Sequence, residues 1–148
     1  MKHSLHHLLC ILMFVAAGCT SATPPPIVPP TNQLDGTHWR LKIIFRRIAD
    51  DIYFDDSLVT HYTLNFGANY TVSGVGDCNQ FSGTYRFGLQ DTIQLTDLHT
   101  TLIGCPDPNT EELYFTGLSQ AIEYRVDTDE MLVYCPGDHV WQLYFYRF

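Results

Sequence analysis

The sequence predicts a mostly β domain of antiparallel strands with a single α-helix, and two observations lead to this fold class. From Leu34 onward, short runs of alternating or aromatic residues are separated by turn residues, which is typical of antiparallel strands. Between Thr110 and Ile122, apolar residues instead recur at helical spacing. Because 45% of the residues are hydrophobic and only 16% are charged, the chain is too apolar to be disordered.

Length and charge limit the organisation of the chain and its partners. The 148 residues allow one domain, or one domain with an added segment. The net charge of −8 leaves no broad positive surface for a phosphate backbone. Nucleic acid is therefore not an expected partner.

Residues 1–18 predict a bacterial lipoprotein signal peptide. Lys2 precedes the apolar stretch Leu8–Ala17, and small residues follow it. The segment Ala16–Cys19 resembles the lipobox of bacterial lipoproteins, which implies cleavage after Gly18, acylation of Cys19 and a lipid anchor in a membrane. Ordinary cleavage that leaves Cys19 free is one alternative. A retained membrane helix is the other, for which the apolar stretch is short.

The residues after the cysteine predict where the protein resides and how it is tethered. Thr20, rather than aspartate, follows Cys19, which fits passage to the outer membrane. We expect a protein of the bacterial cell envelope, lipid-anchored at the outer membrane and facing the periplasm. Thr20–Gln33 contains five of the eight prolines and no charge, so residues 19–33 predict a lipidated cysteine with a semi-rigid tether. We expect residues 34–148 to form the folded domain, and without Lys2 the net charge is −9.

Alternation and turn residues place the strands. The last strand carries two faces, of which the face with Trp141, Leu143 and Phe145 is expected in the core and the face with Val140, Gln142, Tyr144 and Tyr146 outside. An acidic loop, Asp50–Asp56, follows the first strand. The predicted strands are Trp39–Phe45, His61–Phe66, Tyr70–Gly74, Gln80–Phe87, Thr92–Leu98, Thr100–Ile103, Tyr124–Val126, Met131–Tyr134 and His139–Arg147.

One helix, Thr110–Ile122, interrupts the strands. Asn109 is followed three positions later by Glu112, which is a capping-box spacing. Gly117 lowers the helix propensity of the segment. The apolar residues that share one helical face are Leu113, Leu118, Ala121 and Ile122.

The most informative stretch is Val72–Tyr85. It reads as a strand, a glycine-assisted bend with a cysteine at its exit, and a second strand that begins after Asn79. This stretch resembles the vsG-x-GCN-x-F-x-G-x-Y signature of the META domain (HslJ-like) family, with Asp77 where the family usually has a second glycine. The motif positions are occupied by Gly74, Cys78, Asn79, Phe81, Gly83 and Tyr85.

Other segments extend the resemblance over essentially all of residues 34–148. Trp39 after Leu34–Thr37 matches the L-x-G-T-x-W opening of the family, and Thr101–Cys105 matches its T-x-M-A-C segment. The resemblance implies a small, barrel-like antiparallel sheet of about seven to eight strands with one helix. It also implies envelope or secreted proteins without established catalytic residues, loosely linked to stress or antibiotic tolerance.

The resemblance also favours one disulfide. Cys78 and Cys105 both lie in the matched motifs, and cysteines of an oxidising envelope normally pair. A Cys105–Cys135 bond is the next candidate. With Cys78 and Cys105 paired, Cys135 is left free or buried.

Alternative chemistries find less support. The three cysteines with His99 or His139 are a ligand set that zinc accepts, but no CxxC or HxxxH pair follows residue 33, so no metal or other cofactor is expected. The aspartates of Asp50–Asp56 lack the ligand order of a calcium loop, which favours a solvated loop. No G-x-S-x-G motif occurs, and we expect no enzyme.

These observations favour a non-enzymatic envelope lipoprotein. Its META domain would bind a protein or lipid partner, or support tolerance of envelope stress or antibiotics. The alternative is a carrier that holds an acyl chain inside the open barrel.

Overall fold

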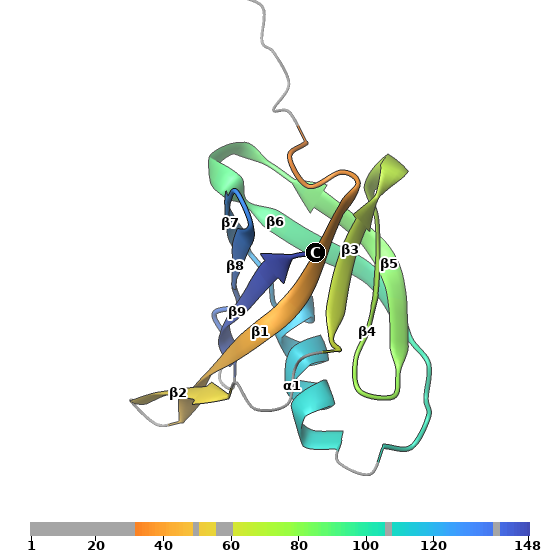
Figure 1. Ribbon diagram of the computed structural model, residues 1–148, viewed down its shortest axis with the longest axis vertical. Helices are drawn as coiled ribbons and strands as arrows, with labels where there is room; N and C mark the ends of the chain where they lie inside the picture. The colour runs from red at the N-terminus through yellow and green to blue at the C-terminus, as the bar shows by residue number, and fades with distance from the viewer. Residues whose placement is uncertain (1–31, 49–50, 56–60, 106–107, 138–139) are drawn as a thin grey trace, which may run out of the picture.

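A computed structural model describes residues 32–48, 51–55, 61–105, 108–137 and 140–148. Among the described residues, nine antiparallel strands form one sheet, and eight of them follow a continuous path that curls into a half-barrel with a single α-helix (Figure 1). The predicted fold class is confirmed. The elements are β1 (Thr37–Ile48), β2 (Asp51–Asp55), β3 (Thr63–Gly67), β4 (Thr71–Val75), β5 (Gln80–Phe87), β6 (Ile93–Thr100), α1 (Pro108–Ser119), β7 (Glu123–Asp127), β8 (Glu130–Tyr134) and β9 (Val140–Arg147), with 3-10 turns at Ala68–Tyr70 and Leu89–Asp91.

The order across the sheet is β6-β5-β4-β3-β1-β9-β8-β7, and β2 pairs with β1 beside this path. The first and last strands are therefore neighbours in the middle of the sheet. Its two edges, β6 and β7, approach each other at one end. There Thr92 bridges to Glu123, and the Ile93 amide donates to the Ile122 carbonyl at 3.0 Å.

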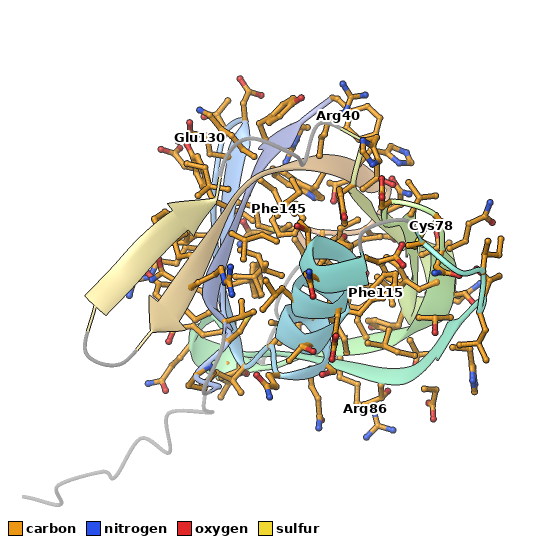
Figure 2. All side chains as sticks on the ribbon, turned by 90° about the horizontal axis from the view of Figure 1, so that it is seen from below. Arg40, Cys78, Arg86, Phe115, Glu130 and Phe145 are labelled. Atoms are coloured by element: carbon orange, nitrogen blue, oxygen red, sulfur yellow. A yellow bond between two sulfur atoms is a disulfide. The ribbon has the colours of Figure 1, made fainter. Side chains whose placement is uncertain are left out.

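The helix α1 covers the opening that the curled sheet leaves. Figure 2 shows the domain from below, with α1 in the mouth of the half-barrel and strands around it. The helix approaches β9 closely at Gly117, where a Cβ atom would lie 3.0 Å from Val140 Cγ1 and 3.1 Å from Leu143 Cδ1. The glycine that weakens the helix locally is thus the residue that lets it pack against the sheet.

Aromatic side chains fill the interior. Buried tyrosines need partners for their hydroxyl groups. The Tyr114 hydroxyl donates to the Thr63 carbonyl at 2.9 Å, and the Tyr85 hydroxyl accepts from Asn32 Nδ2 at 2.7 Å. The largest fully buried side chains are Trp39, Tyr62, Tyr85, Tyr114, Phe66 and Phe145.

The opening motif forms a turn that leads into β1. The Thr37 amide donates to the Leu34 carbonyl at 3.0 Å, and Gly36 takes a φ of +72°, where a side chain would be strained. Thr37 Oγ1 accepts from the indole nitrogen of Trp39 at 2.7 Å. Gly36 and Thr37 therefore stabilise the turn and its contact with Trp39. The two apolar residues of the motif, Leu34 and Trp39, are fully buried.

Two predictions about strands are wrong. The predicted acidic loop Asp50–Asp56 contains strand β2, because Ile52, Tyr53 and Phe54 favour extended structure and pair with the end of β1. The predicted strand Thr100–Ile103 is absent, because β6 runs without interruption from Ile93 to Thr100 and ends there. Residues 49–50 and 56–60 lie outside the described residues.

The helix is shifted toward the N-terminus relative to the prediction. It begins at Pro108, a residue that suits the first helical position, so Asn109 lies inside the helix and the predicted capping box does not form. It ends at Ser119, which leaves Ala121 and Ile122 outside it. Ala121 is still buried, whereas Ile122 is 53% exposed, so Ile122 is not a core residue.

The two faces of the last strand are only partly as predicted. Leu143 and Phe145 are fully buried, but Val140 and Gln142 are buried as well. The pairing with β1 changes register between Gln142 and Val140, which inserts one extra residue. This β-bulge breaks the strict alternation on which the prediction relied. The Trp141 side chain lies outside the described part of the structure.

We predict that Gly74→Ala destabilises the domain. A Cβ atom at Gly74 would collide with the Thr63 carbonyl of β3 and with the Phe81 ring, so neighbouring strands would have to move. The expected loss is about 1–3 kcal/mol in the free energy of unfolding, measured by urea denaturation. The matched control is Gly104→Ala, where no atom lies within 4 Å of the added Cβ. Equal effects of the two substitutions would contradict the prediction.

Candidate functional site

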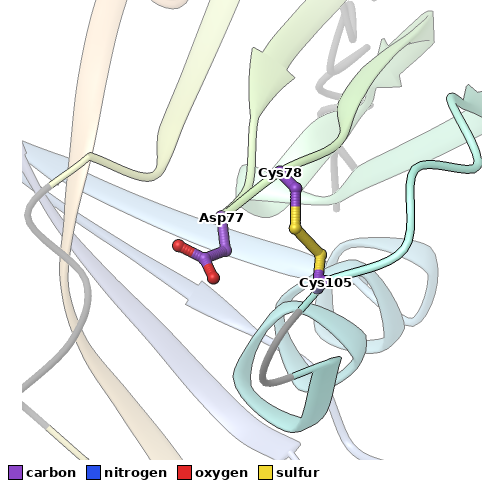
Figure 3. A group of neighbouring side chains, drawn as sticks. All are labelled: Asp77, Cys78 and Cys105. Carbon is purple, nitrogen blue, oxygen red and sulfur yellow. A yellow bond between two sulfur atoms is a disulfide. The ribbon is translucent and has the colours of Figure 1, made fainter.

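Three segments that are distant in the sequence meet beside the N-terminal end of α1. They are the β4–β5 turn (Gly76–Asn79), the segment Thr101–Cys105 and the first turn of the helix. The disulfide Cys78–Cys105 joins the first two, with Cα atoms 5.9 Å apart, a normal separation for such a bond (Figure 3). This confirms the predicted pairing.

Asn79 holds the segment Thr101–Cys105 in place. Its side-chain oxygen accepts from the Thr101 hydroxyl at 2.9 Å and from the Ile103 amide at 2.7 Å. Its side-chain nitrogen donates to the Ile103 carbonyl at 3.0 Å and to Glu111 Oε2 at 2.6 Å. Two acceptor and two donor bonds use the full capacity of this amide group.

Glu111 is the buried acid of the cluster, with only 4% of its surface exposed. Its Oε1 accepts from the Cys78 amide at 3.0 Å and from the Asn79 amide at 2.8 Å. Burial alone would raise the pKa of this carboxyl, but the hydrogen bonds from the Asn79 side chain and from backbone amides outweigh burial and lower the pKa. The carboxylate is therefore ionised near neutral pH, and the dipoles of the amide groups that donate to it stabilise its negative charge.

The turn is shaped to receive this carboxylate. Gly76 packs directly against Glu111, and a side chain at that position would collide with the carboxylate. The turn is closed by a hydrogen bond from the Gly76 amide to the Asn79 carbonyl at 2.7 Å. Asp77 is not among the residues with left-handed backbone angles, and its exposed carboxylate contacts His61 Nε2 at 2.8 Å.

The predicted motif residues divide into two groups. Cys78, Asn79, Thr101 and Cys105 come together at the site. Gly83 faces a bulge in β6, with no room for a Cβ beside the Thr96 carbonyl. The others lie in the sheet and the core, where they shape the half-barrel: Trp39, Gly74, Phe81 and Tyr85.

Glu111 is the residue that sequence reasoning missed. The capping-box spacing drew attention to Glu112, which is exposed. The available signal is helical spacing, because Glu111, Tyr114 and Leu118 lie at positions i, i+3 and i+7 and all three are buried. An acid on an otherwise apolar helix face indicates a specific polar partner.

The remaining cysteines and ligand candidates lie apart from this cluster or are already bonded. Asp77, Cys78 and Cys105 place possible ligand atoms within 4.8 Å of one another, but the disulfide uses both sulfurs. Cys135 is free and buried, and burial raises the pKa of its thiol to about 12. Cys19 and His139 fall outside the described residues.

A groove opens beside the cluster, between the end of β6 and α1. Its volume is about 410 Å³. Leu102 stands at its rim with 95% of its surface exposed, and Ile103 next to it is 60% exposed. The groove is lined by Asn79, Thr100, Thr101, Leu102, Glu111, Glu112, Phe115, Thr116 and Ser119.

The chain belongs to the META domain family, whose sequence profile matches residues 32–145. No curated protein matches the chain. Among the described residues, no helix has the length and apolar character needed to span a membrane.

Solved structures that share the fold include three proteins. A protein from Burkholderia xenovorans solved by NMR has a TM-score of 0.60 at 19% identity, over 78% of this chain and 83% of the other. A DUF4847 family protein from Bacteroides vulgatus has a TM-score of 0.55 at 14% identity, over 77% and 94%. A further NMR structure has a TM-score of 0.53 at 19% identity, over 77% and 91%.

We predict that Glu111→Gln destabilises the domain in a pH-dependent way. An unfolded glutamate has a pKa of about 4.3, and the folded value is lower, so the ionised carboxylate stabilises the fold above about pH 4.3. This contribution is lost as the pH falls through the folded pKa. At pH 7 the variant should lose about 1–3 kcal/mol in the free energy of unfolding, because an amide cannot accept all the bonds of the carboxylate.

The control for this substitution is Glu112→Gln, which changes the exposed neighbour and should alter stability by less than about 0.5 kcal/mol. Urea denaturation at several pH values between 7 and 3 measures both variants. A deficit of Glu111→Gln that stays constant over this range would show that the ionised form is not the source of the effect.

We predict that alkylation distinguishes the three cysteines of the domain. Without reductant, iodoacetamide should leave Cys135 unmodified in the native protein at pH 8, since the thiol is buried and its pKa is high. In denaturant it should modify Cys135 alone, and after reduction Cys78 and Cys105 as well. Mass spectrometry of peptides reads the result, and three modified cysteines without reductant would rule out the disulfide.

Proposed function

We propose that this protein is a non-enzymatic, lipid-anchored envelope protein whose META domain serves as a binding module for a partner. The observation that supports it is how the polar groups and cysteines of the site are bonded. Asn79, Glu111 and both motif cysteines are bonded to one another or to backbone, and they position a segment that carries exposed apolar side chains. This arrangement suits recognition rather than reaction chemistry, which needs a reactive group directed at a substrate.

The position of the first described residues of the domain supports this proposal. In Figure 1 the described chain enters at one end of the half-barrel, while α1 lies at the opposite end. A lipid on Cys19 and the proline-rich tether would hold the domain at the outer membrane, facing the periplasm, with the helix end directed away from the point of attachment. A protein bound there would contribute to envelope stability under stress or antibiotics.

The acyl-chain carrier is less well supported. The interior between the described strands is filled by buried aromatic side chains such as Trp39, Phe66 and Tyr114. An acyl chain inside the half-barrel would have to displace part of this packed core. Close-packed interiors resist such insertion.

The anchor is tested by metabolic labelling of bacterial cells that produce the full chain with radioactive palmitate. The unmodified chain should carry the label, and Cys19→Ala should lose it completely. Cys10→Ala is the matched control, since Cys10 lies within the predicted signal and should leave labelling unchanged. Equal labelling of the unmodified chain and Cys19→Ala would reject the lipid anchor.

A further inference from the structure

We infer that the groove beside the disulfide binds a short peptide segment of a partner protein, with apolar side chains flanked by lysine or arginine. This inference deepens the proposed binding function and rests on it. It commits to one surface, between Thr101–Ile103 and the exposed side of α1, and to one kind of occupant.

The first reason is the exposure of two neighbouring aliphatic side chains. Leu102 is 95% exposed and Ile103 is 60% exposed. Phe115 of α1, half-buried, lines the same groove as Leu102, and in Figure 2 it lies on the side of the helix toward Cys78. Adjacent apolar side chains at the rim of a groove mark an interaction surface more strongly than isolated ones do.

The second reason is that this exposure is fixed. The Thr101 amide donates to the Gln80 carbonyl, and the Asn79 amide group bonds to both the amide and the carbonyl of Ile103. The disulfide at Cys105 holds the other end. The segment therefore cannot fold Leu102 inward without breaking these bonds. Because the segment is already ordered in the free protein, a partner that binds it loses little conformational entropy in this segment.

The third reason is the polar lining, which favours a peptide over an acyl chain. Thr116 and Ser119 on α1, and Thr100 at the end of β6, line the groove together with its apolar residues, and the Ser119 hydroxyl donates to the Thr116 carbonyl at 2.8 Å. An acyl chain would cover these polar side chains without offering hydrogen bonds in return, which is unfavourable. A peptide backbone offers both donors and acceptors.

The fourth reason is charge. The lining contains two carboxylates and no basic residue; Glu111 is fully used within the fold, whereas Glu112 is exposed and forms no ion pair with described residues. Arg46 lines a separate groove with Glu112, and neither of the two ion pairs found among the described residues joins them. With a net charge of −8 for the whole chain, a basic residue beside the apolar anchor complements this rim.

The test is a selection of random twelve-residue peptides, displayed on phage, against the full chain produced in a bacterial host and purified in detergent. Enriched peptides are synthesised and their dissociation constants measured by fluorescence anisotropy. We expect sequences with two or more apolar residues next to lysine or arginine.

Three variants make the selection specific to the groove. Leu102→Asp should raise the dissociation constant at least tenfold, and Glu112→Lys should raise it several-fold. Leu89→Asp is the matched control: Leu89 is 78% exposed on a turn outside the groove lining, and its substitution should leave binding unchanged. Thermal melting of each variant separates lost binding from lost folding.

Several outcomes would overturn the inference: no enriched peptide, enriched acidic peptides, or peptides that bind folded Leu102→Asp as tightly as the unmodified chain. A fatty acid that remains bound in native mass spectra, and is lost in Leu102→Asp, would assign the groove to lipid instead. None of these readouts depends on Cys19, so the palmitate experiment decides the anchored state independently. A labelled chain whose groove binds no peptide would keep the anchor and lose only this surface.

Discussion

The hydrogen bonds between the Glu111 carboxylate and the turn at Cys78–Asn79 fix the helix to the sheet, and the form of the domain depends on them. The half-barrel is joined at its two edges by a single bridge, so α1 must cover the remaining opening. Apolar packing of Tyr114 and Leu118 drives the helix toward the sheet but does not set its depth or rotation. The Glu111 carboxylate sets the depth and rotation of the helix, because a buried ionised group is stable only where hydrogen-bond donors surround it.

The same bonds link the helix to the segment before it. The Asn79 side chain donates hydrogen bonds both to the Glu111 carboxylate and to the Ile103 carbonyl. A displacement of α1 would therefore also move the segment that carries Leu102. The disulfide adds a covalent link between the turn and this segment. Helix, turn and segment therefore behave as one rigid unit, on which the proposed recognition surface stands.

Much of the fold could be predicted because the local sequence pattern of most strands agrees with their burial and pairing in the sheet. Strand β5 was predicted with its observed bounds, since alternation, a preceding turn and the motif all coincide there. Strand β2 was missed because four aspartates dominate the composition of Asp50–Asp56, while pairing with β1 decides the structure. The burial of Val140 depends on a bulge in the β1–β9 pairing, which no local pattern in the last strand reveals.

Only part of the candidate site could be predicted, because one of its residues is recognised by tertiary contacts and not by a local pattern. The family motif identified Cys78, Asn79, Thr101 and Cys105, because each carries a recognisable residue type at a fixed spacing. Glu111 lies outside these motifs, and its role appears only when the helix is placed against the turn. Packing of the helix against the sheet puts Glu111, rather than the exposed Glu112, on the buried face with Tyr114 and Leu118.

The pairing of β1 with β9 also determines when the domain can assemble. The strands β3 to β6 pair with sequence neighbours, so they form contacts of short range that close quickly. β1 pairs with β3 and β2 along one edge, whereas its other edge stays open until Val140–Arg147 have been made. An open edge in mid-sheet is a template for pairing with other chains. Chains that lack β9 are therefore an aggregation hazard, because β9 is the strand that closes this edge.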